Sequence, residues 1–122
     1  MHNMHQCTNC HSTLLVEKLH CETCEIRYTG SFGLPRLARL APAQQRLAEQ
    51  LVLAAGNLKQ MAASLEISYP TLRKRLHELV EALGALRSAD DALAAHYLED
   101  VEAGVMTPES AARRIKELNG AI

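Results

Sequence analysis

Four cysteines near the amino terminus constrain the fold of this chain more than any other feature. They form two Cys-x-x-Cys pairs, Cys7 with Cys10 and Cys21 with Cys24, with ten residues between the pairs. A two-residue gap lets a tight turn present two thiolates to one ion, and two such turns complete the tetrahedral site that zinc prefers. The spacing predicts one structural Zn²⁺ held by all four cysteines, with no position open to a substrate.

The segment around these cysteines is predicted to be a zinc ribbon over residues 1–34. Residues 13–19 and 26–32 have the composition of short strands, one on each side of the second cysteine pair. A segment with so few apolar side chains is not expected to fold without its metal.

Two other interpretations of the cysteines are weaker. A redox dithiol is usually a single Cys-x-x-Cys at the start of a helix in a βαβ unit, and that context is absent here. His5, His11 and His20 lie beside the cysteines, and one of them could replace a thiolate. Because four cysteines already complete the tetrahedron, we interpret these histidines as solvated neighbours.

The rest of the chain is expected to be helical. Aromatic residues make up only 3% of the sequence and Trp is absent, so Leu and Ala must fill the core. The predicted fold class is therefore mainly α with a small N-terminal β zinc ribbon. No apolar run approaches the ~20 residues that span a bilayer, and the first residues lack the features of a signal peptide. We therefore expect a cytoplasmic protein, in which disulfides are disfavoured.

Residues 35–87 are predicted to form a helix-turn-helix domain behind a short connector. The predicted helices span residues 42–55, 58–65 and 69–83. Pro42 suits the first turn of the first helix, Asn57 and Ser68 supply caps for the next two, and Gly84 is predicted to end the third.

The second and third of these helices, joined by three residues, match the helix-turn-helix pattern. Ala62 is small enough for the two helices to approach closely, and Ile67 in the turn is expected to enter the core. Glu66 stands where this turn often has Gly, and it is the one departure from the pattern. Leucines at +4, +3 and +4 spacing predict a buried face on the third helix: Leu72, Leu76, Leu79 and Leu83.

The amino-terminal half of the third helix is the predicted reading surface for DNA. Arg73 is the best candidate for a base edge, because Arg pairs bidentately with guanine, whereas Lys side chains suit phosphates. An isolated Arg-Lys-Arg run would merely solvate a helix, but within a helix-turn-helix we favour DNA contact. The predicted DNA-binding residues are Lys59, Tyr69, Thr71, Arg73, Lys74, Arg75 and His77.

The charge distribution supports the same surface. The net charge of −1 by itself argues against a dedicated DNA-binding protein. Residues 35–87, however, carry eight basic and four acidic residues, a net of +4, while residues 88–122 carry three basic and seven acidic residues, a net of −4. The middle of the chain could therefore face phosphate, while the tail would repel it.

The tail, residues 88–122, is predicted to be a helical hairpin. Residues 89–103 form one amphipathic helix, Gly104 breaks it, and Thr107, Pro108 and Glu109 start another. The hairpin is too small to be stable alone, so we expect it to pack on the middle domain or on a second copy. A further hypothesis is that the acidic tail shields the basic helix until a partner removes it.

Five stretches of the sequence are together typical of one family. They are CTNC at 7–10, CETC at 21–24, LPRLARL at 34–40, GNLKQM at 56–61 and ISYPTLR at 67–73. With these the chain resembles a bacterial family called domain of unknown function 2089, over nearly all of residues 7–84. The resemblance implies a zinc ribbon followed by a helix-turn-helix like that of sigma-factor region four. In the tail, LEDVEAG at 98–104 and TPESAA at 107–112 are similar to a SHOCT-type helical hairpin.

Two functions follow from these patterns. The first is a zinc-containing DNA-binding transcription regulator, expected to be a homodimer because one small module reads few base pairs. The alternative is a module that binds a transcription component such as a sigma factor or RNA polymerase, favoured by the lack of a basic total charge. We do not expect an enzyme and assign no catalytic residue, because the sequence offers no nucleophile–base arrangement and no phosphate-binding Gly loop.

Overall fold

The computed structural model describes residues 5–118, and its fold is mainly helical with one small hairpin. The hairpin strands are β1 (Val16–His20) and β2 (Arg27–Phe32), followed by a 3-10 turn, η1 (Arg36–Arg39). The helices are α1 (Pro42–Leu53), α2 (Leu58–Leu65), α3 (Tyr69–Glu102) and α4 (Pro108–Leu118). The predicted fold class is confirmed as a mainly α fold with a small N-terminal β hairpin beside the two cysteine pairs. No helix among the described residues is long and apolar enough to cross a membrane.

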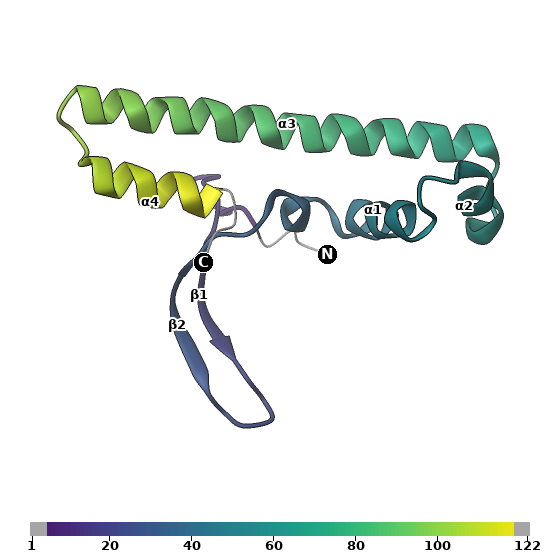
Figure 1. The fold of residues 1–122 in the computed structure, drawn as a ribbon, viewed down its shortest axis with the longest axis horizontal. Coiled ribbons are helices and arrows are strands. Elements are labelled where there is room, and N and C mark those ends of the chain that lie inside the picture. The colour runs from purple at the N-terminus through teal and green to yellow at the C-terminus, as the bar shows by residue number, and fades with distance from the viewer. Residues whose placement is uncertain (1–4, 119–122) are drawn as a thin grey trace.

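The β-hairpin projects away from the helices (Figure 1). β1 and β2 are antiparallel, with Val16 opposite Phe32 and His20 opposite Arg27, and a bulge between Val16 and Lys18. Most of its side chains are exposed on both faces. An isolated two-stranded hairpin is only marginally stable in water. This hairpin, called the arm below, therefore has few interactions of its own that stabilise it.

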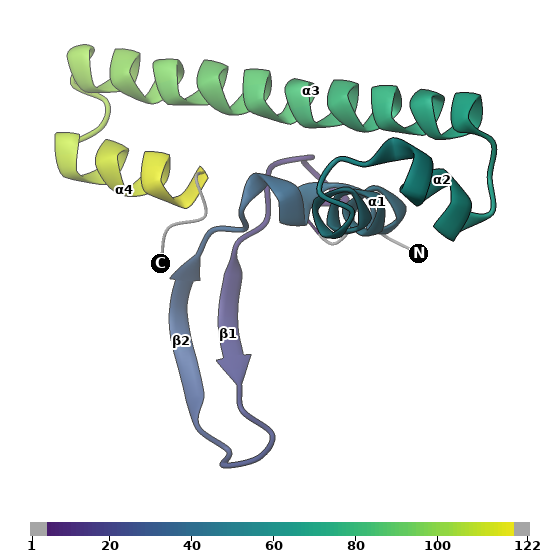
Figure 2. The same ribbon diagram turned by 45° about the vertical axis from the view of Figure 1, so that its right-hand side comes forward.

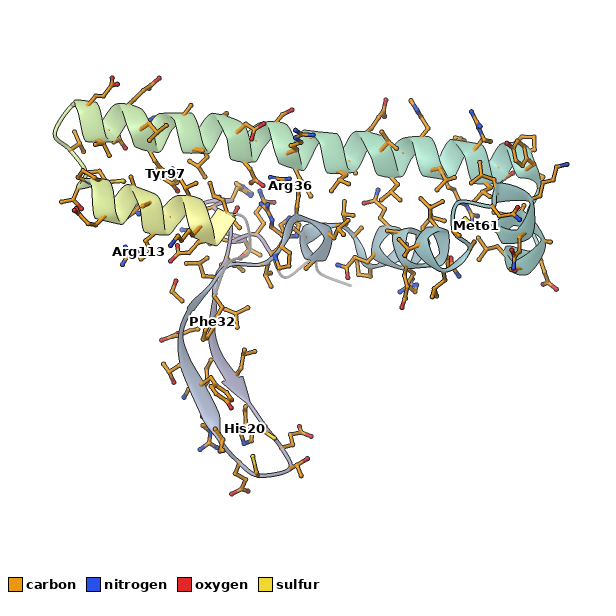
Figure 3. The ribbon with its side chains drawn as sticks, in the orientation of Figure 1. His20, Phe32, Arg36, Met61, Tyr97 and Arg113 are labelled. Atoms are coloured by element: carbon orange, nitrogen blue, oxygen red, sulfur yellow. The ribbon has the colours of Figure 1, made fainter. Side chains whose placement is uncertain are left out.

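The core lies where α1 and α2 pack against the amino-terminal half of α3. Its fully or almost fully buried side chains include Leu40, Leu47, Met61, Leu72 and Leu79. In Figure 3, Met61 lies between α2 and α3. The predicted leucine face of the third helix is confirmed, since its other two members, Leu76 and Leu83, pack partly buried against the same core.

The prediction that Gly84 ends the third helix is wrong. α3 continues without a break to Glu102, so the expected helices at 69–83 and 89–103 are one helix of 34 residues. At 1.5 Å per residue this helix is about 51 Å long, and it runs along the whole row formed by α2, α1, η1 and α4 (Figures 1 and 2). The predicted domain boundary at residue 87 falls inside it and stays a prediction.

Tertiary packing explains why the helix passes through Gly84. A helical Gly costs about 1 kcal/mol relative to Ala, which is a weak penalty. On either side of it Leu83 and Leu86 pack against the core, and Asp90 one turn further is held by two arginines. Among the described glycines, Gly56 and Gly104 have the positive φ typical of a helix stop, and Gly84 does not.

Gly84→Ala is therefore expected to raise the free energy of unfolding by about 0.5–1 kcal/mol. A Cβ at this position would meet no heavy atom within 4 Å. Urea unfolding followed by circular dichroism measures the change. Gly56→Ala is the matched control, because its Cβ also meets open space but its φ of +78° should make the substitution destabilising. A loss of stability in Gly84→Ala would contradict its place in a regular helix.

α4 folds back antiparallel along the second half of α3, which forms the predicted tail hairpin. Gly104, with φ of 74°, makes the break, and Thr107 Oγ1 accepts a hydrogen bond from Ser110 N at 3.2 Å to start α4. The straight α3 separates the acidic residues from the predicted reading surface, since Asp91 lies 18 positions, or about 27 Å, along the helix from Arg73. Within one molecule this geometry disfavours the shielding hypothesis.

A buried ion pair joins the connector to the middle of α3. Arg39 donates to both carboxylate oxygens of Asp90, with 2.9 Å from Nη1 to Oδ1, and Arg36 Nε donates to Oδ2 at 3.0 Å. Arg39 is 3% exposed and Asp90 6%. In Figure 3, Arg36 points from η1 toward α3. Burial alone would raise the pKa of Asp90, but the hydrogen bonds from Arg39 and Arg36 outweigh it and hold that pKa below its usual value.

The end of α4 packs beside this ion pair, at the place where the connector meets α3, which is called the junction below. Arg39 Nη2 lies 3.4 Å from the carbonyl oxygen of Leu118, and Ser31 Oγ donates to Glu117 Oε1 at 2.9 Å. Gly33 is buried here, and a Cβ built on it would lie 1.8 Å from the backbone oxygen of Glu117. The three predicted segments of the chain therefore meet at one place, where the backbones of residues 33 and 117 nearly touch.

Candidate nucleic-acid interface and cysteine turns

The turn between α2 and α3 has the hydrogen bonds of a closed helix-turn-helix. Asn57 Oδ1 accepts from Gln60 N at 3.2 Å and caps α2. At the other end Glu66 adopts the left-handed conformation, with φ of 55° and ψ of 41°, and Ile67 N donates to Ala62 O at 3.1 Å. A glutamate thus adopts the backbone geometry for which Gly is favoured, so the departure noted in the sequence does not alter the turn.

The same turn positions the start of α3. Ser68 Oγ accepts a hydrogen bond from Thr71 N at 3.3 Å, which confirms the predicted cap. The two hydroxyl oxygens of Ser68 and Thr71 lie 2.7 Å apart, so the Thr71 hydroxyl is already engaged within the helix. Ile67 packs partly buried against the core, as expected.

The predicted DNA-binding side chains are all exposed. They are Lys59 on α2 and Tyr69, Thr71, Arg73, Lys74, Arg75 and His77 on α3. The guanidinium carbon of Arg73 lies 6.0 Å from the centre of the Tyr69 ring, one turn earlier. This cation–π contact holds the Arg73 side chain near the amino-terminal end of α3 and reduces the freedom it must lose on binding.

His77 differs from the other members of this set. Its Nε2 lies 3.1 Å from Glu81 Oε1, and both side chains are largely exposed. The carboxylate occupies one ring nitrogen and adds a negative charge beside it. Among the predicted residues, His77 is therefore the least suited to meet a phosphate.

The structure changes the charge argument for the middle of the chain. Arg36 and Arg39, two of the eight basic residues counted in residues 35–87, are bound to Asp90 at the junction. They are not available to an external phosphate. The sequence gives a weak signal for this role, because both arginines lie three residues apart on one side of a short turn in LPRLARL.

The two cysteine pairs form turns with the same hydrogen bonds. In the first turn, Cys7 N donates to Ser12 O at 2.9 Å and His11 N to Cys7 O at 2.9 Å. In the second, Cys21 N donates to Ile26 O at 2.9 Å and Glu25 N to Cys21 O at 2.7 Å. The fifth residue of each turn, His11 or Glu25, has φ of 62°.

The thiols of these turns are solvent-accessible and hydrogen-bonded. The Ser12 side chain lowers the pKa of the Cys10 thiol, with Cys7 adding to the effect. The backbone and thiol of Cys24 lower the pKa of Cys21. Each turn therefore presents two thiols of the type that zinc binds.

The four cysteines do not converge on one point in this arrangement. The second turn joins β1 to β2 at the far end of the hairpin, next to His20 in Figure 3, whereas the first turn precedes β1. Within residues 5–118 no group of three or more Cys, His, Asp or Glu is placed to hold a metal. The donor chemistry fits zinc, but each turn supplies only half of a tetrahedral site.

Comparison with known proteins identifies the helical middle of the chain. Residues 40–86 match the family model described as Domain of unknown function (DUF2089)-HTH. The match spans α1, α2 and the first half of α3, and leaves out the cysteine turns and α4. No curated protein and no solved structure matches the chain.

Proposed function

Because residues 40–86 form a DUF2089-HTH domain, we propose that this protein binds duplex DNA and acts as a transcription regulator. The observation that carries the proposal is the amino-terminal half of α3, a capped second helix of a helix-turn-helix whose outer face is basic and exposed. Such a helix enters the major groove with its first turns against the base edges. The proposal assigns the chain no enzymatic activity.

The proposed roles follow from position and chemistry. Arg73, ordered over Tyr69, contacts a guanine edge, and Lys74 and Arg75 contact phosphates beside the groove. Lys59, in the first turn of α2, adds a phosphate contact from the other helix of the motif. A single module of this size gives modest affinity, so specificity would come from two copies on two half-sites.

The test is a titration of labelled duplex DNA at several salt concentrations with the parent chain and with Arg73→Ala/Lys74→Ala. The logarithm of the affinity should fall linearly with the logarithm of the salt concentration, with a slope of roughly 0.9 per neutralised phosphate. The double variant should lose about 10- to 100-fold in affinity, because a good bidentate base contact is worth about 1–3 kcal/mol. Its slope should also become shallower.

The matched control is Arg113→Ala/Lys116→Ala, which removes the same charge from exposed positions on α4. This variant should bind DNA as the parent does. Equal losses of DNA affinity in both double variants would show that binding depends on the total charge of the chain and not on the face of α3. Absence of binding at low salt by folded protein would contradict the proposal.

A second candidate function is recognition of a transcription protein. It is favoured by the internal use of Arg36 and Arg39, which weakens the electrostatic case for DNA. In that case a sigma factor or RNA polymerase would co-purify with the chain after nuclease treatment, and Arg73→Ala/Lys74→Ala would leave that association intact. Salt-sensitive DNA binding and nuclease-resistant association therefore separate the two functions.

We further propose that Cys7, Cys10, Cys21 and Cys24 together bind one structural Zn²⁺. The support is that two turns with matching hydrogen bonds each carry two free cysteines, one exposed and one partly buried, and that zinc in structural sites takes four ligands. A shared site requires the first turn to approach the second. Bound zinc would stabilise the arm and have no part in chemistry.

Metal analysis tests this proposal directly. The purified parent chain should contain one zinc per chain with four sulfur ligands in its X-ray absorption spectrum. Replacing either pair by serine, Cys7→Ser/Cys10→Ser or Cys21→Ser/Cys24→Ser, should abolish tight binding, because two thiolates do not complete the site. Undiminished zinc content in either variant would contradict a shared four-thiolate site.

A further inference from the structure

The outer side of α1 carries an apolar groove with no partner among the described residues. The groove encloses about 610 Å³ between α1 and η1. Val52 is 77% exposed and Leu53 79%, and Leu37 on η1 is 55% exposed. Leu47, on the inner side of the same helix, is buried in the core. α1 is thus apolar on both sides, whereas a helix that only supports the core needs one.

The charges that line this groove are arranged symmetrically about the middle of α1. The helix runs from Pro42 to Leu53, so its midpoint lies between residues 47 and 48. Arg46 and Glu49, which both line the groove, are equidistant from that point. Neither takes part in an ion pair within the described part of the chain. A twofold axis through the midpoint would place each Arg46 opposite the Glu49 of a second copy.

The same axis matches the apolar ends of the groove. It places Leu53 of one copy against Pro42 of the other, and both residues line the groove. Leu37 extends the wall of the groove next to Pro42, where it would cover the partner's Leu53. One twofold operation therefore pairs apolar with apolar at the ends of the helix and positive with negative near its middle, as an isologous interface requires.

We propose that the outer face of α1 is a dimerisation surface on which a second copy of this chain packs, with the two α1 helices antiparallel. A helix of 12 residues is about 18 Å long, so the contact is smaller than the roughly 800 Å² per partner of a standard interface. The dimer should therefore form in the micromolar range and dissociate on dilution. The inference stands on α1 and η1 and does not depend on DNA binding.

Sedimentation velocity from about 1 to 300 µM, in the absence of DNA, tests the surface. The parent chain should shift from monomer to dimer across this range, which corresponds to micromolar affinity. Leu53→Lys should remain monomeric. Val80→Lys, which places the same charge at a 67% exposed position on α3, is the control and should dimerise like the parent. Circular dichroism verifies that both variants are folded.

Charge reversal tests the proposed register. Arg46→Glu alone brings two glutamates together across the axis, and Glu49→Arg alone brings two arginines together, so each variant should dimerise at least 10-fold more weakly. In an equimolar mixture of the two single variants, a chain with two glutamates in the groove faces a chain with two arginines. Opposite charges then meet at both places across the axis, and the mixture should recover the dimer. The double variant Arg46→Glu/Glu49→Arg should recover it as well.

Three outcomes would overturn the proposal. The first is a parent chain that stays monomeric at 300 µM. The second is a Leu53→Lys variant that dimerises as the parent does, since the interface would then lie elsewhere. The third is a loss in the single charge variants without recovery in the mixture, which would exclude the antiparallel pairing of Arg46 with Glu49.

Discussion

Replacing Asp90 by alanine is expected to lower the free energy of unfolding by about 3–5 kcal/mol, the cost of removing one partner from a buried ion pair. Asp90 accepts hydrogen bonds from Arg39 and Arg36, and both Asp90 and Arg39 are buried. Without the carboxylate, the Arg39 guanidinium would remain buried with its charge uncompensated. Since a small domain is stabilised by only about 5–15 kcal/mol, the loss should be visible as a large drop in the urea midpoint.

Asp91→Ala is the matched control for this experiment. Asp91 is the next residue on α3, is exposed, and carries the same charge. Its removal should change stability by less than about 0.5 kcal/mol, as is usual for surface positions. Equal effects of Asp90→Ala and Asp91→Ala would mean that the ion pair contributes nothing specific.

The ion pair should also give a defined pH dependence. The pKa of Asp90 is lower in the folded chain than in the unfolded chain, so the unfolded state binds the proton more readily. The stabilisation is therefore fully present above the unfolded pKa of about 3.9 and is lost as the pH falls through the lower, folded value. The stability difference between the parent and Asp90→Asn should be constant near neutral pH and shrink below about pH 4.

Gly33→Ala is expected to separate α4 from the rest of the molecule. The added Cβ would lie 1.8 Å from the Glu117 carbonyl oxygen and 2.8 Å from its Cα, so backbone must move. Overpacking typically costs about 1–3 kcal/mol, and a clash with backbone belongs at the upper end. Hydrogen exchange should show faster exchange of the α4 amides, while the amides of α2 and the first half of α3 keep their protection.

Gly30→Ala is the control for the Gly33 substitution. A Cβ at Gly30 would approach only the side chain of Phe32, at 3.1 Å, and that ring can shift. The α4 amides of this variant should exchange as in the parent. Unchanged exchange in Gly33→Ala would show that the close packing of residues 33 and 117 is not maintained in solution.

Local sequence rules predicted the parts of this fold that depend on neighbouring residues. Asn57 and Ser68 cap α2 and α3, and the leucines of α3 face the core as their spacing indicates. The same reasoning predicted that the residues proposed to contact DNA are exposed, because one side of α3 faces solvent when the other side is buried. The DNA contacts themselves stay predictions.

The sequence by itself determined where the helices of the middle segment begin, the caps of α2 and α3, and the two matching cysteine turns, because hydrogen bonds and periodicity within a few residues decide these features. Tertiary structure alone decided that α3 continues through Gly84 and that position 33 requires glycine. It also decided that Arg36 and Arg39 donate hydrogen bonds to Asp90. Each of these depends on contacts between residues more than fifty positions apart or on packing from other helices. A weak local preference, such as the penalty of one helical Gly, is overcome by such contacts because they act on several residues at once.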